Sequence, residues 1–516
     1  MSNQTSDNNK RIAKNTLLLY VRMLFMMAIG LFTSRVILNA LGVSDMGLMS
    51  VAASVITMFT FLNATLASGT QRFISYAIGE NNIERLKTVF KSAMTLHLLL
   101  AIIILILGET IGLWYVYNKL NVEPGRFHAA MWCYQLSIIS TMVGLIQLPF
   151  DSALIAHEKM GVYAYMTIFD AVFKLLAAYL IQIVNFDKVI FYSVLTFIAG
   201  LLSTFLYNWY CRKYFKECSF SFGYNKSIFK NMLSFSGWNT FGCLAAMGQG
   251  TGVNLIINSF CGTVVNGARG IAFQANGWVT RFVENFMVAL NPQIVKSYAS
   301  GDIQRMSSLV INGARFGCYL FLLLAIPLFI EIEFVLKIWL GQCPEHTVAF
   351  MRIVMIETLF RTMGAPTITA MHATGQMKLL NITVGSILLL IVPVSYICFR
   401  SGVSPEQVLL INVIPWVIVP FVRVFLVKKY SQGKFPVGQY LCQAVLKTVA
   451  MALLMFVPIY LISFCMQTYA DWIRFCVIFV GSLTYSAIII YYVGVEKKYR
   501  IFLIEKIKSK IGYGEK

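Results

Sequence analysis

Charged side chains occur in pairs, three or four residues apart, inside strongly apolar segments of the sequence. The three pairs are Asp170 with Lys174, Arg281 with Glu284, and Glu357 with Arg361. Residues at these spacings are neighbours on an α-helix, so a carboxylate and a cation can form an ion pair there. An ionisable group inside a bilayer is costly and needs a partner, water or a function. The pairs therefore either lower the cost of insertion or line a hydrated cavity.

Basic residues outnumber acidic residues in these apolar segments. The basic residues include Arg22, Arg35, Arg72, Lys174, Arg281, Arg315, Arg352, Arg361, Arg423 and Lys447, and the acidic residues include Glu109, Asp151, Asp170, Glu284 and Glu357. Four of the basic residues lie near a predicted helix end, from which a long side chain can reach the interface. These four are Arg72, Arg315, Arg423 and Lys447. The excess of positive charge favours an anionic solute over a cationic one.

The composition indicates that the bilayer is the solvent for these segments. Of the 516 residues, 58% are hydrophobic and 12% are charged, whereas a soluble domain has about 25% charged residues. The formal charge is +20. In a soluble protein this charge would suggest nucleic-acid binding, but cytoplasmic loops of membrane proteins are also rich in Lys and Arg. We therefore expect no nucleic-acid partner.

The chain is predicted to be an all-α polytopic membrane protein. A helix needs about 20 apolar residues to cross the hydrocarbon core. On that basis the predicted spans are 16–41, 47–78, 89–117, 127–155, 160–184, 188–213, 231–260, 264–296, 304–331, 346–374, 378–400, 407–429, 438–464 and 472–495. Lys and Arg concentrate in alternate connections and in both tails, which predicts that both termini are cytoplasmic and that the number of spans, about fourteen, is even.

Two halves of the chain carry similar short motifs. Ser75-Tyr76-Ala77 recurs as Ser297-Tyr298-Ala299, each copy at the end of the second helix of its half. Similarity at a fixed interval indicates a duplicated unit. Here the unit has six helices, so both copies have the same orientation and form a parallel repeat. The predicted divisions are an N-terminal tail (1–15), an N-lobe (16–213), a cytoplasmic linker (214–230), a C-lobe (231–429), two further helices (438–495) and a basic tail (496–516).

Polar stripes on two predicted helices provide candidate binding residues. In helix 47–78 the stripe contains Arg72 and otherwise small or hydroxyl residues, interrupted only by Phe61, within an arc of about 80°. In helix 264–296 one face carries Gln274, Arg281 and Asn285. Small residues also promote helix packing in membranes, but Arg72 on the stripe favours a polar lumen.

These features resemble a known superfamily. The six-plus-six duplication, the sequence SYAIGENN at 75–82, the IWLG…P stretch at 338–344 and two extra C-terminal helices resemble the multidrug/oligosaccharidyl-lipid/polysaccharide exporter (MOP) superfamily. Within it the chain most resembles the bacterial Wzx-like polysaccharide flippases. The resemblance implies two lobes around a central cavity and a protein of the bacterial inner membrane.

The resemblance implies a flippase for a polyprenyl-diphosphate-linked oligosaccharide, such as a precursor of O-antigen or lipopolysaccharide. Amide groups suit sugar hydroxyls, and arginine binds phosphate through paired donors. The candidate substrate-binding residues are Arg22, Arg35, Arg72, Gln274, Arg281 and Asn285, and those for ion coupling are Asp170, Lys174, Glu284, Glu357 and Arg361. We expect a monomer in contact with membrane lipids, with no cofactor or metal, and with Na⁺ or H⁺ as a possible coupling ion.

Two other functions remain as alternatives. A multidrug cation antiporter of the same superfamily needs an accessible carboxylate, and the predicted helices 16–41 and 231–260 contain no Asp or Glu. A membrane-embedded polysaccharide polymerase usually needs a sizeable extramembrane loop with acid–base residues, and no long connection is predicted. We therefore expect a transporter and not an enzyme.

Overall fold

The computed structural model describes residues 15–30, 32–33, 36–37, 40–41, 60–118, 125–218, 223–340, 345–495 and 500. All regular structure among them is helical. Of the predicted site residues, Arg35 lies outside the described residues. Residues 341–344 of the IWLG…P stretch also lie outside the described residues. So do the N-terminal tail except Asn15 and the C-terminal tail except Arg500.

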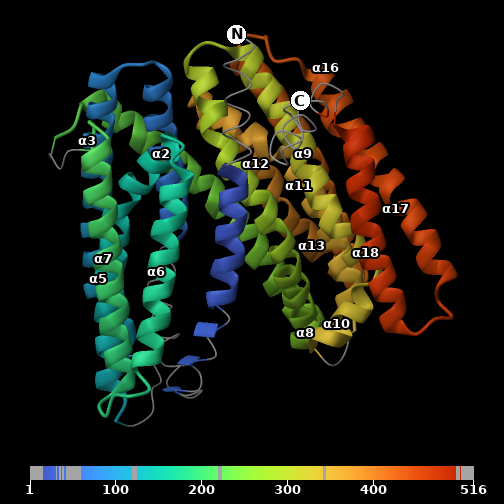
Figure 1. Ribbon diagram of the computed structural model, residues 1–516, viewed down its shortest axis with the longest axis horizontal. Coiled ribbons are helices and arrows are strands. Elements are labelled where there is room, and N and C mark those ends of the chain that lie inside the picture. The colour runs from blue at the N-terminus through green and yellow to red at the C-terminus, as the bar shows by residue number, and fades with distance from the viewer. Residues whose placement is uncertain are drawn as a thin grey trace, which may run out of the picture. The chain divides into compact units, whose positions relative to one another are not determined.

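The helices follow one another along the whole described chain (Figure 1). In the first half they are a helix at Asn15–Gly30, α2 (Thr60–Gly79), α3 (Ile83–Leu107), η1 (Gly108–Gly112), α4 (Leu113–Asn118), α5 (Phe127–Ala156), α6 (Met160–Leu180), α7 (Lys188–Tyr214) and α8 (Lys226–Ala299). In the second half they are α9 (Ile303–Ile330), α10 (Ile332–Leu340), α11 (Thr347–Thr374), α12 (Met377–Leu389), α13 (Ile391–Arg400), α14 (Pro405–Ile411), α15 (Val413–Tyr430), α16 (Val437–Tyr440), η2 (Leu441–Leu446), α17 (Lys447–Cys465), α18 (Asp471–Ile489) and η3 (Ile490–Gly494).

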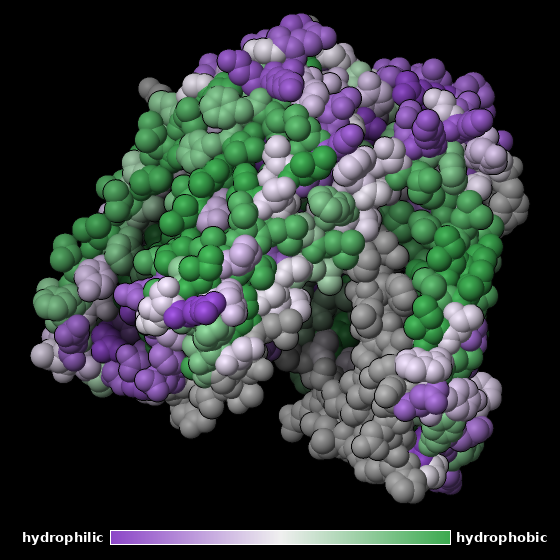
Figure 2. Space-filling model, turned by 180° about the vertical axis from the view of Figure 1, so that it is seen from behind, coloured by the Kyte–Doolittle hydropathy of each residue, from purple (hydrophilic) through white to green (hydrophobic). Residues whose placement is uncertain are grey.

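Apolar composition and length suit these helices to a bilayer. Among the described residues, ten helical stretches are long and apolar enough to cross a membrane. In Figure 2 hydrophobic residues cover the sides of the helices, and hydrophilic residues gather towards their ends. The chain is therefore an all-α polytopic membrane protein, as the composition predicts. The predicted count of about fourteen spans is compatible with the ten found in the described part.

The chain divides into two compact units. The first comprises Met1–Leu244, Val288–Asp302 and His372–Ile382, and the second comprises Ala245–Met287, Ile303–Met371 and Thr383–Lys516. In the first unit α5 packs against α2, α3 and α7, with Phe90 and Phe150 edge-to-face in the core. In the second unit α9 packs against α17 and α18. Three short stretches of the predicted C-lobe thus pack within the first unit.

Helical residues run without a break through α8, where two separate spans are predicted. The guanidinium of Arg269 nevertheless donates a hydrogen bond to the side chain of Asn254, which is 15 residues earlier. In a straight α-helix these residues would be about 22 Å apart, at 1.5 Å per residue, which is too far for the two side chains to meet. The chain must therefore reverse between them, as two antiparallel spans require.

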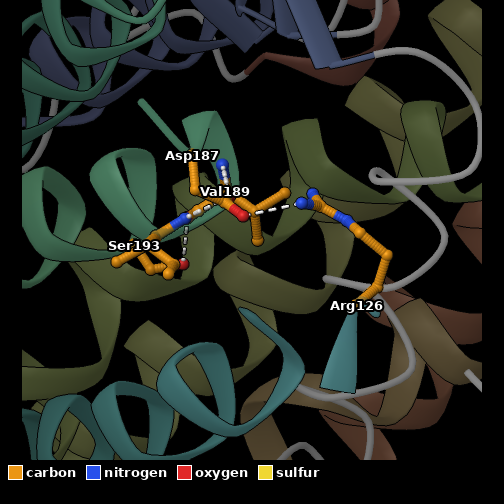
Figure 3. A network of polar contacts seen from close by, with 5 residues as sticks. Arg126, Asp187, Val189 and Ser193 are labelled. Atoms are coloured by element: carbon orange, nitrogen blue, oxygen red, sulfur yellow. Dashed lines mark hydrogen bonds and ion pairs between the residues drawn. The ribbon is translucent and has the colours of Figure 1, made fainter. Parts of the chain in front are cut away.

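A charged contact fixes the connection that leads into α7 (Figure 3). The carboxylate of Asp187 accepts hydrogen bonds from the backbone N–H groups of Val189 and Ile190, which caps the helix. Such a cap satisfies donors that the first helical turn leaves unpaired. Arg126, at the start of α5, places its Nη1 2.6 Å from Asp187 Oδ2. The α5 and α7 ends are thereby held together.

Candidate functional site

A polar cavity of about 490 Å³ lies inside the first unit, among α5, α6 and α7. Most of its lining residues carry a hydroxyl or an amide group. The lining includes Ser137, Ser140, Thr141, Gln147, Thr167, Asp170, Lys174, Thr196, Ser203, Thr204 and Tyr207. Serine and threonine can satisfy their hydroxyls on the carbonyl one turn earlier, and Thr141, Thr167 and Thr196 do so. These residues are therefore compatible with an apolar helix while still presenting oxygen atoms to the cavity.

The predicted pair Asp170 and Lys174 lies in this polar cavity. Lys174 Nζ is 2.7 Å from Asp170 Oδ2 across one turn of α6, and Ser203 Oγ donates to Asp170 Oδ1 at 3.2 Å from α7. The side chains of Asp170 and Lys174 are 26% and 44% exposed. The ion pair is therefore reachable from the cavity, and a cation or proton that binds Asp170 would compete with Lys174.

A chain of side-chain hydrogen bonds borders the same cavity. Thr204 Oγ1 donates to Gln147 Oε1 at 2.9 Å, and Gln147 Nε2 donates to Asp151 Oδ1 at 3.2 Å. The hydroxyl of Tyr207 is buried and has no hydrogen-bond partner within the described structure. A buried donor without a partner is costly. Tyr207 is thus a ready donor or acceptor for a bound solute.

The second unit carries a cluster of five charged residues, Arg269, Arg281, Glu284, Glu357 and Arg361, which we term the charged cluster. Arg361 Nη1 is 3.6 Å from Glu357 Oε1, and its guanidinium lies 4.9 Å from the ring of Trp416. Glu284 is attracted by both Arg281 and Arg361, and Glu357 by both Arg361 and Arg269. Two of the predicted pairs, Glu284 with Arg281 and Glu357 with Arg361, are therefore parts of one network.

Arg269 belongs to this charged cluster but was not among the predicted residues. It is buried, stacks 4.4 Å from the Phe273 ring, and its Nε has no hydrogen-bond partner among the described residues. Its position inside the predicted span 264–296 was the signal that could have identified it. With Arg269 included, three arginines face two glutamates.

The side chains of the predicted polar face of α8 are exposed or half-buried in the second unit. Gln274 and Arg281 are exposed and Asn285 is half-buried. Asn285 Nδ2 donates to the carbonyl of Arg281 at 2.9 Å. A neighbouring contact ties this part of α8 to α11, because Asn276 Nδ2 donates to Thr358 Oγ1 at 2.8 Å.

Arg22 and Arg72 both lie in the first unit, in different surroundings. The guanidinium of Arg22 is 4.8 Å from the Tyr163 ring, and its buried Nε and Nη1 have no hydrogen-bond partner in the described part of the chain. Arg72 Nε donates to the carbonyl of His372 at 2.7 Å, and Nη2 donates to that of Ala373 at 3.1 Å. Arg72 therefore joins α2 to the end of α11, whereas Arg22 retains donors for a ligand.

A buried carboxylate outside the predicted set makes a similar connection. Glu158 follows α5 and its side chain is 2% exposed. Its Oε1 lies 2.6 Å from Lys296 Nζ, and its Oε2 accepts from Gln293 Nε2 at 2.7 Å. No sequence pattern distinguishes Glu158 from an ordinary charged residue in a short connection. Its backbone φ of +60° lies in the left-handed region, which is uncommon for a residue other than glycine.

Comparisons with known proteins agree with this architecture. Residues 19–180 match the MatE family model. Among solved structures, a MATE protein in a straight conformation is similar to the chain (TM-score 0.70, 12% identity, 82% of this chain and 96% of that one). A multidrug resistance MATE transporter in an outward-facing conformation is also similar (TM-score 0.68, 13% identity, 82% and 97%).

A third similar structure is a MOP superfamily transporter from Pyrococcus furiosus (TM-score 0.69, 13% identity, 82% of this chain and 96% of that one). It is described as having a binding pocket of reversed polarity that suggests a different function. No curated protein matches the chain. The chain thus has the fold of MATE transporters, and its residues 19–180 carry the sequence pattern of the MatE family.

Proposed function

We propose that the chain is an exporter that works by alternating access between two six-helix lobes, in a bacterial cytoplasmic membrane with both termini inside. The observation that carries this proposal is the polar cavity with its reachable Asp170–Lys174 pair. Ionisable groups held among membrane helices mark solute or ion pathways. Na⁺ and H⁺ are the two candidate coupling ions.

The comparisons favour a multidrug cation antiporter over a flippase as the detailed function. One of the similar structures is a multidrug resistance transporter, and the polar cavity offers the carboxylate that such a protein needs. Asp170 would bind the coupling ion or the cationic solute after release from Lys174. Glu284 and Glu357 would be further carboxylates for a cation, although each is attracted by two arginines.

The arginines favour a second candidate, a flippase for a lipid-linked oligosaccharide. The charged cluster has three arginines against two glutamates, and Arg22 and Arg269 retain buried donors. Arginine donors suit a diphosphate, and the Pyrococcus furiosus transporter shows that pocket polarity differs within the superfamily. Gln274, Arg281 and Asn285 would then contact the glycan headgroup.

A deletion strain separates the two candidates. The strain would be assayed for sensitivity to cationic dyes, for surface polysaccharide, and for lipid-linked oligosaccharide retained in the inner leaflet. New dye sensitivity with normal surface polysaccharide supports the antiporter. Loss of surface polysaccharide with retention of its lipid-linked precursor supports the flippase. A strain that is normal in all three assays contradicts both.

Complementation then ties the phenotype to the polar cavity. Asp170→Asn should fail to restore the lost activity, because it removes the charge that Lys174 and the coupling ion share. Asp471→Asn is a matched control, since Asp471 is 56% exposed at the start of α18 and pairs with Arg474 at 3.4 Å. Equal complementation by both variants would remove Asp170 from the mechanism.

A further inference from the structure

A second cavity in the first unit, of about 480 Å³, is basic and aromatic. Four elements surround it: the end of α2, the start of α3, the first turns of α8 and the connection between α11 and α12. Its described lining includes three cations and no carboxylate: Arg72, Arg85 and Lys378, with Tyr76 and Trp238 beside them. We call it the basic pocket.

Local contacts hold each cation at the edge of the basic pocket. Arg85 Nη1 lies 2.8 Å from Glu80 Oε2, and its guanidinium is 5.4 Å from the Tyr76 ring. Lys378 Nζ is 5.5 Å from the Trp238 ring. Lys378 and Arg85 are both exposed, so their charges are available to a ligand that enters from outside.

Arg72 and Gly375 close the inner wall of the basic pocket. Gly375 has a φ of +76°, and a Cβ at this position would lie 2.7 Å from Arg72 Nη2. Only glycine adopts that backbone conformation at no steric cost. The glycine therefore lets the guanidinium reach the carbonyls of His372 and Ala373, which keeps its charge at the wall.

An apolar stripe on α8 adjoins the basic pocket. Asn231, Ser234 and Trp238 face the pocket. At about 100° per residue, Phe241 lies about 50° round the helix from the mean direction of these three residues, and Leu244 and Leu233 follow on the same side at about 115° and 130°. The side chains of Phe241, Leu244 and Leu233 are 42%, 47% and 50% exposed. A cationic pocket for a polar head therefore lies next to an exposed surface that suits a hydrocarbon chain.

We propose that the basic pocket binds the phosphate headgroup of an anionic membrane phospholipid, whose acyl chain lies along Leu233, Phe241 and Leu244. Guanidinium and ammonium groups form strong charge-assisted hydrogen bonds with phosphate, and basic pockets between membrane helices bind anionic headgroups. The apolar stripe favours a lipid over a soluble phosphate. This site is distinct from the polar cavity and does not depend on which solute is exported.

Native mass spectrometry of the purified protein in detergent tests the proposal. The ligand would be a dioctanoyl phosphatidylglycerol, with dioctanoyl phosphatidylcholine as the zwitterionic comparison. Arg85→Gln and Lys378→Gln should each weaken phosphatidylglycerol binding about fivefold, as expected for one basic residue near a lipid headgroup. Both side chains are exposed, so neither change should prevent folding.

Lys429→Gln supplies the matched control. Lys429 Nζ lies 5.8 Å from the Tyr430 ring in the second unit, which resembles the position of Lys378 beside Trp238. Its removal should leave the affinity unchanged. Unchanged affinity in Arg85→Gln and Lys378→Gln, or an equal loss in Lys429→Gln, would overturn the site.

A separate arm tests the acyl chain. Leu233→Ser should weaken binding of dioctanoyl phosphatidylglycerol, because it removes an exposed part of the apolar stripe. Inorganic phosphate and the chain-free headgroup glycerophosphoglycerol should bind far more weakly than the lipid. If either binds as tightly as the lipid, the ligand is a soluble phosphate compound and the lipid assignment is wrong.

Discussion

Gly79 and Ala299 bring the two copies of the repeated motif into direct contact. A Cβ on residue 79 would lie 2.7 Å from Ala299 Cβ and 2.9 Å from the carbonyl oxygen of Lys296. Gly79 ends the SYAIG copy at the end of α2, and Ala299 lies in the SYASG copy at the end of α8. The repeat detected in the sequence is therefore also a packing interface within the first unit.

Gly79→Ala should destabilise the protein. An alanine usually stabilises a helix interior relative to glycine by up to about 1 kcal/mol, but here the added methyl group must displace backbone atoms. Gly481→Ala in α18 is the control, because a Cβ at this position meets nothing within 4 Å. In thermal unfolding, the midpoint should fall for Gly79→Ala and stay or rise for Gly481→Ala. Equal shifts would contradict the close packing.

Removing the buried carboxylate of Glu158 should have a larger effect than removing a surface one. Glu158→Gln removes the charge that pairs with Lys296 at a site where the carboxylate is 2% exposed, and breaking a buried pair costs about 3–5 kcal/mol. Glu84→Gln breaks the exposed pair with Lys87 and should cost about 0–1 kcal/mol. Chemical unfolding measures both. A double variant with Lys296→Met that is no more stable than Glu158→Gln would argue against the pairing.

Glu331 should anchor the last two helices to α9. Ser463 Oγ donates to Glu331 Oε1 at 2.9 Å from α17, and Arg474 Nε donates to Oε2 at 3.1 Å from α18. We expect Glu331→Gln to increase proteolysis in the connection between α17 and α18, since both contacts weaken. Glu333→Gln is the control, because Glu333 is 62% exposed and pairs with Lys337. Similar proteolysis of both variants would count against the anchor.

Two exposed cysteines test the predicted orientation. Cys442 and Cys465 lie at opposite ends of the stretch Val437–Cys465, which is long enough to cross a bilayer. With both termini cytoplasmic, this span runs outward. Single-cysteine proteins in intact spheroplasts should therefore react with a membrane-impermeant maleimide at Cys465 and not at Cys442. The opposite pattern would reverse the topology.

More of the fold than of the candidate site could be predicted from the sequence. Long apolar segments and helix caps such as Asp187 are local properties, so their helices could be predicted. The reversal within α8 also agrees with the two predicted spans. Charged pairs one turn apart, such as Asp170 and Lys174, could be predicted for the same reason. The contacts of Glu158 with Lys296 and of Arg72 with His372 join segments far apart in the chain, and no local pattern reveals them.

The sequence and the comparisons differ on the charge expected of the solute. Arginines within apolar segments indicated an anionic substrate. The structure gives those arginines different surroundings. Arg72 donates to two backbone carbonyls, so its charge stabilises packing, whereas Arg22 and Arg269 retain buried donors. Counting charges along helices cannot separate these roles, because hydrogen-bond partners come from tertiary structure.

The proposed export function is tested most directly by transport with the purified protein in liposomes under an imposed sodium or proton gradient. The two solutes would be a cationic dye and a lipid-linked oligosaccharide. We expect the wild-type protein to move one of them in response to a gradient. Asp170→Asn should then reduce the rate by an order of magnitude or more, while Asp471→Asn leaves it unchanged. Movement of neither solute, or an Asp170→Asn rate equal to that of the wild type, would contradict an exporter that works through the Asp170 cavity.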